Sequence, residues 1–70
     1  KVLDQRVLGN KHLKFVLTPK GAHKPVDAIK FFADDQQLKT NYQTLNIYYE
    51  LNVNEFRGEQ SLQLLIRNIF

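Results

Sequence analysis

The stretch NVNEFRGEQSLQLLIRNI, from Asn52 to Ile69, decides the fold of this 70-residue chain. Hydrophobic and polar residues alternate on both sides of a turn that contains Gly58. Such alternation is typical of half-buried antiparallel strands, and glycine permits the positive φ that a tight turn needs. We therefore expect a β-hairpin with a loop over residues 54–60, in which Phe56 folds back to close one end of the domain.

The same period of two recurs upstream. Residues 12–18, 46–53 and 61–67 alternate strictly, whereas residues 2–8 and 26–32 are weaker candidate strands. The stretch from 33 to 45 is polar and does not alternate, so we expect it to hold a short helix that begins near Asp34. Asp34 or Asp35 should cap the first turn of this helix.

One buried core should form from the hydrophobic positions that the alternation directs inward. In the strand 26–32 these positions are Ile29 and Phe31, while Ala28, Lys30 and Phe32 are expected to point outward. Tyr42 should pack at the core or its edge. The whole predicted core is Leu13, Phe15, Leu17, Ile29, Phe31, Ile47, Tyr49, Leu51, Val53, Leu62, Leu64 and Ile66.

Three strands, a link and two more strands predict one all-β domain over residues 1–70, a small five-stranded Greek-key barrel of the OB type. The alternative is an SH3-like barrel, which also has five strands but in which the corresponding link is usually a single 3₁₀ turn. The link over residues 33–45 is longer than such a turn, so it favours the OB fold.

The charge is unevenly distributed along the chain. Residues 1–30 hold seven lysine and arginine residues against two aspartates, a net charge of +5, whereas residues 31–70 have a net charge of −2. A basic half suggests a polyanionic partner, although exposed lysines also serve simply as solvated surface. The chain has no cysteine and no apolar run long enough to span a membrane, so we expect part of a longer cytoplasmic protein.

No catalytic constellation is visible in the sequence. His12 and His23 lie in different segments and have no carboxylate at metal-ligand spacing, and the acids at 34–35 suit a helix start. We therefore expect no catalytic residue and no metal site in this chain.

A nucleic-acid surface is the strongest candidate site. If the strands 12–18 and 26–32 pair, their outward residues form one patch, in which lysines attract phosphates and an exposed aromatic ring stacks on a base. Alternatively, Phe32 packs beneath the link over residues 33–45, and Tyr48 covers this link and does not stack on a base. The predicted nucleic-acid-binding residues are Lys11, His12, Lys14, Lys30, Phe32, Tyr48 and Arg57.

The segments DQRVLGNKHLKFVL, VDAIKFF and ELNVNEFRGEQSLQLLIRNI together resemble the C-terminal OB domain of bacterial RecJ, the exonuclease specific for single-stranded DNA. The resemblance runs from about Val7 to Ile69, and the turn TPKGAHKPV is longer and more basic than the family pattern. It implies an accessory domain of a 5′-to-3′ DNA exonuclease of repair and recombination. The catalytic core, which holds manganese or magnesium ions in that family, would lie outside this chain.

Two functions remain open at this stage. The domain either holds single-stranded DNA or packs as a structural module against its own catalytic core or another protein. The basic outer surface favours DNA, whereas the aliphatic residues Leu65 and Ile69, which point outward, favour a protein cover.

Overall fold

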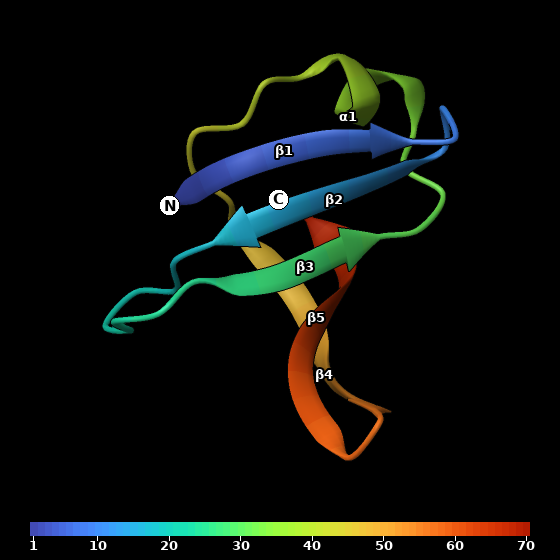
Figure 1. Ribbon diagram of the computed structural model, residues 1–70. Coiled ribbons are helices and arrows are strands. Elements are labelled where there is room, and N and C mark those ends of the chain that lie inside the picture. The colour runs from blue at the N-terminus through green and yellow to red at the C-terminus, as the bar shows by residue number, and fades with distance from the viewer.

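The computed structural model describes all residues from Lys1 to Phe70. Three strands come first, then one short helix, then two longer strands, as the sequence predicted (Figure 1). In chain order they are β1 (Val2–Leu8), β2 (His12–Leu17), β3 (Val26–Lys30), α1 (Asp35–Lys39), β4 (Ile47–Phe56) and β5 (Glu59–Ile69).

All five strands belong to one curled sheet with the order β1-β2-β3-β5-β4. Every neighbouring pair is antiparallel except β3 and β5, which run parallel because the link with α1 crosses over between them. This confirms the all-β fold class with an OB-type strand order. No ladder joins the edge strands β1 and β4, so the barrel is open along one seam.

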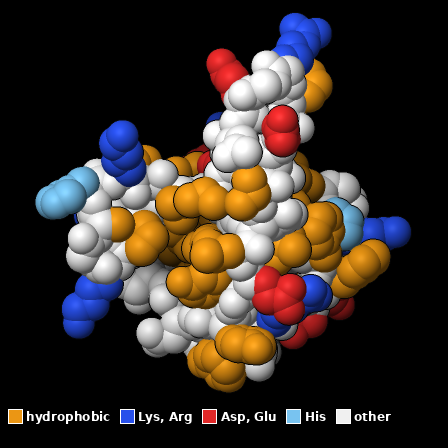
Figure 2. Space-filling model, turned by 90° about the horizontal axis from the view of Figure 1, so that it is seen from below, with side chains coloured by type: hydrophobic (Ala, Val, Ile, Leu, Met, Phe, Trp, Pro, Cys, Tyr) orange, Lys and Arg blue, Asp and Glu red, His pale blue; other side chains and the backbone are white.

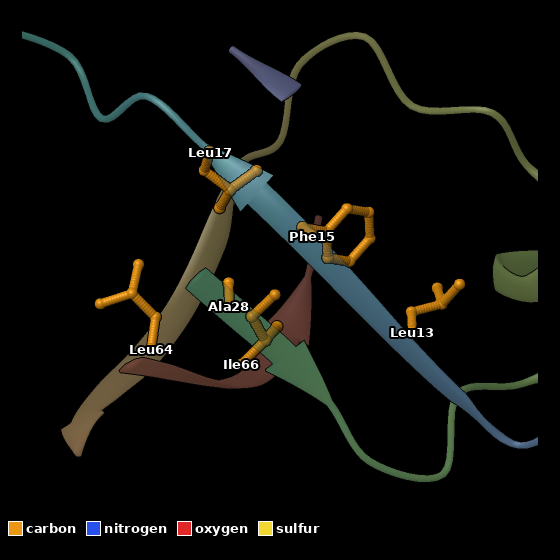
Figure 3. Packing of buried hydrophobic residues seen from close by; sticks show 6 residues of the cluster. All are labelled: Leu13, Phe15, Leu17, Ala28, Leu64 and Ile66. Atoms are coloured by element: carbon orange, nitrogen blue, oxygen red, sulfur yellow. The ribbon is translucent and has the colours of Figure 1, made fainter. Parts of the chain in front are cut away.

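The core lies on the concave face of the sheet. Its centre is Phe15 of β2, which is fully buried together with Leu13. Figure 3 shows side chains from three strands converging there. The cluster consists of Leu13, Phe15, Leu17, Ala28, Leu64 and Ile66.

The link between β3 and β4 closes one end of this core. The Asp34 carboxylate caps α1 by accepting a hydrogen bond from the Gln37 N–H at 2.8 Å, and the Asp34 N–H donates to Oε1 of Gln37 at 3.1 Å, which makes a capping box. Tyr42 packs edge-on against Phe15, with ring centroids 6.0 Å apart. The predicted helix start and the packing role of Tyr42 are therefore confirmed.

The inward and outward faces of β3 differ from the prediction. Ala28 lies opposite Phe15 and is fully buried, whereas Ile29 lies opposite Lys14 on the convex face, where it is also buried. Phe31 follows the end of the strand and is 49% exposed. The predicted alternation was wrong for two reasons. The residue beside Phe15 is Ala28 and not Ile29, and the strand ends at Lys30, so Phe31 lies outside it.

The hairpin of β4 and β5 is longer than predicted. β4 continues to Phe56 and β5 begins at Glu59, so the turn contains only Arg57 and Gly58, which both have positive φ. This two-residue turn replaces the expected loop over residues 54–60. Phe56 is 72% exposed and does not close the end of the domain.

Most of the hairpin's predicted core residues are not covered. Figure 1 shows the hairpin projecting away from the other strands, and Figure 2 shows hydrophobic side chains gathered over the middle of the face that is seen from below. Ile47 is half-buried at the core margin. The residues that the structure leaves exposed, contrary to prediction, are Tyr49, Leu51, Val53 and Leu62. They share a face with Leu64 and Ile66, but β3 pairs only with Gln63–Leu65 and nothing lies over the rest.

Candidate nucleic-acid interface

The corner where β3 ends is tied to the turn between β1 and β2. Phe32 has a φ of 54°, which is unusual for a bulky residue, and its N–H donates a hydrogen bond to Nδ1 of His12 at 3.0 Å. The next N–H, of Ala33, donates to the carbonyl of Lys11 at 2.8 Å. These two bonds hold the backbone in a conformation that turns the Phe32 side chain away from the core.

Three aromatic rings meet at this corner. The His12 ring lies edge-to-face with both neighbours, at centroid distances of 5.2 Å to Phe31 and 5.0 Å to Phe32. Phe32 is 76% exposed, so it does not tuck under the link. The cluster therefore offers a flat apolar ring to solvent on a backbone that is fixed by hydrogen bonds.

A shallow hollow of about 320 Å³ lies beside the rings, and we call it the aromatic hollow. Two phenylalanines, two aliphatic side chains and two cationic side chains line it. Its lining is Lys30, Phe31, Phe32, Leu65, Ile66 and Arg67. Apolar and aromatic surface beside cations suits a nucleobase that carries a phosphate.

Both cations of the aromatic hollow have partners within the domain. Nζ of Lys30 donates to the Phe31 carbonyl at 3.1 Å, and the Arg67 guanidinium donates to the Glu50 carboxylate at 2.9 Å. The hydrogen bond from Arg67 and, after it, the charge attraction lower the pKa of Glu50, and the same contacts raise the pKa of Arg67. All of these groups are near solvent, so a phosphate could compete for either cation.

Lys14 does not share a face with Lys30, contrary to the prediction. Lys14 pairs with Ile29 on the convex face, and Lys30 pairs with the buried residue Leu13, which faces the other way. Next to Lys14 on β1 is Arg6, which forms an ion pair with Asp4 at 2.9 Å. The convex face is therefore mixed in charge rather than uniformly basic.

The remaining predicted residues lie elsewhere. Arg57 is at the tip of the hairpin, where its guanidinium lies 5.2 Å from the centre of the Phe56 ring. Because β3 and β5 are parallel, this tip extends beyond the Val26 end of β3, whereas Lys11 lies beyond the other end. Tyr48 is exposed on β4 opposite Asn68. The structure thus brings Lys11, His12, Lys30 and Phe32 together but places Arg57 at the far end of the sheet.

Two members of the aromatic hollow were missed by the sequence reasoning. Phe31 was assigned to the core, and Arg67 was read only as an outward residue of its strand. The pair of phenylalanines at the end of a strand was an available signal, because strict alternation cannot bury both. Arg67 could not have been found in this way, because its position depends on the parallel pairing of β3 with β5.

No group of three or more histidine, cysteine, aspartate and glutamate side chains lies close enough together to bind a metal ion. The single helix is too short to cross a membrane.

Comparison with known proteins gives a consistent result. The family model described as the RecJ OB domain matches residues 1–68. The "Single-stranded-DNA-specific exonuclease RecJ" of Escherichia coli is 38% identical over 71 residues, which cover 100% of this chain and 12% of that protein. The protein of the same name from Haemophilus influenzae is 44% identical over 69 residues, covering 94% of this chain and 12% of the relative. No solved structure gives a significant match.

Proposed function

Because this chain belongs to the RecJ OB domain family, we propose that it is the single-stranded-DNA-binding accessory domain of a RecJ-type 5′-to-3′ exonuclease. The chain spans about an eighth of the relatives' length, so the catalytic core and its manganese or magnesium ions would lie in the rest of the polypeptide. The aromatic hollow carries the proposal, because it combines an exposed, backbone-fixed ring with two cations.

Side chains of the hollow and of the adjoining end of the β1–β2 turn have distinct roles in this proposal. Phe32 offers a plane on which any base can stack, which gives affinity without sequence preference. Lys30 and Lys11 attract phosphates, and their contribution comes mainly from the release of counterions from the DNA. His12 holds the Phe32 ring in place through an edge-to-face contact, and Phe31 in turn packs edge-to-face against His12.

A substitution at Phe32 tests the stacking role. In the full-length enzyme, Phe32→Ala should weaken binding of a single-stranded oligonucleotide by about 1–3 kcal/mol, as measured by fluorescence anisotropy. Phe56→Ala is the matched control, because Phe56 is equally exposed but lies at the hairpin tip. Equal losses in the two variants, or none in either, would contradict the assignment of the hollow.

Salt dependence tests the lysines. If Lys30 and Lys11 each neutralise one phosphate, replacing both by Gln should flatten the log–log salt slope by roughly 1–1.5 units. Replacing Lys20 and Lys24, in the turn between β2 and β3, removes the same charge from the opposite end of β3 and should leave the slope nearly unchanged.

A second function, docking against protein, is favoured by one observation. The apolar face of the hairpin, with Tyr49, Leu51 and Val53, is uncovered in this chain and lies away from the aromatic hollow.

A further inference from the structure

The backbone of Phe32 is held by a titratable side chain. Its φ of 54° lies in the left-handed region that a bulky residue rarely adopts, and such a conformation persists only where its surroundings enforce it. The side-chain contact that enforces it here is the hydrogen bond from the Phe32 N–H to Nδ1 of His12, at 3.0 Å. The direction of the exposed Phe32 ring therefore depends on one acceptor nitrogen of an imidazole.

This hydrogen bond requires one protonation state of His12. An imidazole nitrogen accepts a hydrogen bond only when it carries no proton, so the bonded ring is neutral and its proton is on Nε2. An imidazolium ring is a donor at both nitrogens and would set an N–H against the N–H of Phe32. Histidine is the side chain type whose charge ordinarily changes between about pH 5 and pH 8, so a modest fall in pH can break the contact.

No carboxylate stands ready to replace the lost bond by an ion pair. The ring of His12 contacts Phe31 and Phe32, and its partner on β1 is Leu8. The cationic side chains on the surrounding elements are Arg6, Lys11, Lys14, Lys30 and Arg67. The carboxylates on these elements have other partners or positions: Asp4 pairs with Arg6, Glu50 with Arg67, Asp34 accepts from the Gln37 N–H, and Asp27 lies opposite Val16, four residues along β2.

We propose that His12 is a positioning residue for Phe32, whose ring it holds in the exposed orientation only while its own imidazole is neutral. Protonation removes the acceptor, so the Phe32 backbone relaxes out of the left-handed region and the ring leaves its place. The bond from the Ala33 N–H to the Lys11 carbonyl does not involve the imidazole, so the rest of the corner stays in place. Single-stranded DNA should then bind less tightly at acid pH, although acid adds positive charge. This last step rests on the proposed function, whereas the control of Phe32 by His12 does not.

Two substitutions separate the acceptor of His12 from its ring. His12→Asn keeps an acceptor at the position of Nδ1, because the side-chain oxygen of asparagine is also bonded to Cγ, and it does not titrate. His12→Phe keeps an aromatic ring beside Phe31 and Phe32 but has no acceptor. His23→Asn, in the turn between β2 and β3, is the matched control because it removes the other histidine of the chain.

Amide exchange in the 70-residue chain, measured by NMR, tests the control of Phe32 without DNA. The exchange rate of the Phe32 N–H is divided by that of the Ala33 N–H, so that the direct effect of pH on exchange cancels. From about pH 8 to pH 5 this ratio should rise roughly 3- to 10-fold in the parent and in His23→Asn, as one hydrogen bond is lost. It should stay constant in His12→Asn and be high at every pH in His12→Phe. A constant ratio in the parent, or a His12→Phe ratio equal to that of the parent at the higher pH, would overturn the proposal.

Binding of a single-stranded oligonucleotide by the full-length enzyme tests the consequence for DNA and does not require the short chain to fold. At a salt concentration that screens surface charges, the parent should lose roughly 3- to 10-fold more affinity than His12→Asn over the same fall in pH. An affinity that instead rises relative to His12→Asn would mean that the imidazolium contacts a phosphate directly, which would overturn the positioning role. If the exchange ratio changes as expected but both proteins show the same pH dependence of binding, His12 controls Phe32 and the aromatic hollow is not the DNA site. That result would contradict the proposed function and support the positioning role.

Discussion

β2 and β4 show the same period-two alternation but have opposite degrees of burial. The inward residues of β2, Leu13, Phe15 and Leu17, are at most 6% exposed, because the link lies over them. On β4, Leu51 faces the same way as Leu64 of its partner strand and is nevertheless 67% exposed. Alternation therefore determines which face a side chain occupies, whereas burial depends on what the rest of the chain places over that face.

The largest expected effect tests this contrast. Phe15→Ala should destabilise the domain by roughly 3–5 kcal/mol, because it leaves a cavity at the centre of the only core cluster. Leu51→Ala in the same 70-residue chain should change stability by less than about 0.5 kcal/mol, because Leu51 is already in solvent. Urea unfolding of both variants measures the difference, and similar losses would mean that the hairpin face is covered in solution.

The same comparison shows what the sequence could predict. The succession of strands and helix along the chain, the helix cap at Asp34 and the buried face of β2 follow from local patterns, because turns, caps and alternation are short-range properties. The exposure of Leu51 and the reversed faces of β3 depend on which distant strand lies alongside. No local pattern contains that information.

The predicted residues of the candidate site also fall into two groups, those whose positions follow from neighbouring segments and those whose positions depend on distant strand pairing. Lys11, His12 and Phe32 were predicted together and are together, because the turn between β1 and β2 and the end of β3 are neighbours in any three-stranded meander. Arg57 was grouped with them on the assumption that the hairpin tip returns to the same end of the sheet. The parallel pairing of β3 with β5 places it at the other end.

Polar contacts at the link and in the hairpin should also differ in how much they contribute to stability. Gln5 of β1 donates to the Thr40 carbonyl at 2.7 Å and accepts from the Tyr42 N–H at 3.0 Å, in a partly buried position. Gln5→Ala should therefore cost about 1–3 kcal/mol, because two backbone groups of the link lose their partners.

The matched change in the hairpin is Asn54→Ala, which removes one exposed bond to Gln63. It should alter stability by no more than about 0.5 kcal/mol. Thermal unfolding of the two variants checks the contrast. A larger loss for Asn54→Ala would show that the hairpin, and not the link, limits the stability of the domain.

The smallest expected effect is the pH dependence of the ion pair between Glu50 and Arg67. The contact with Arg67 lowers the pKa of Glu50 in the folded chain, whereas in the unfolded chain this carboxyl titrates at its ordinary value. Between the two values the unfolded state binds more protons, so the contribution to stability is complete above the ordinary pKa and is lost as pH falls through the lowered one. Because the pair is exposed, the contribution is small and screened by salt.

Thermal unfolding of Glu50→Gln and of the parent chain between neutral and acid pH tests this expectation. The parent should be slightly more stable at neutral pH, and the two curves should converge as the solution becomes acid. Glu55→Gln is the matched control on the same strand, since Glu55 has no cationic partner and should show no such advantage. If DNA competes for Arg67 at the aromatic hollow, bound oligonucleotide should abolish the difference between parent and Glu50→Gln. A difference that persists unchanged in the complex would place the DNA away from Arg67.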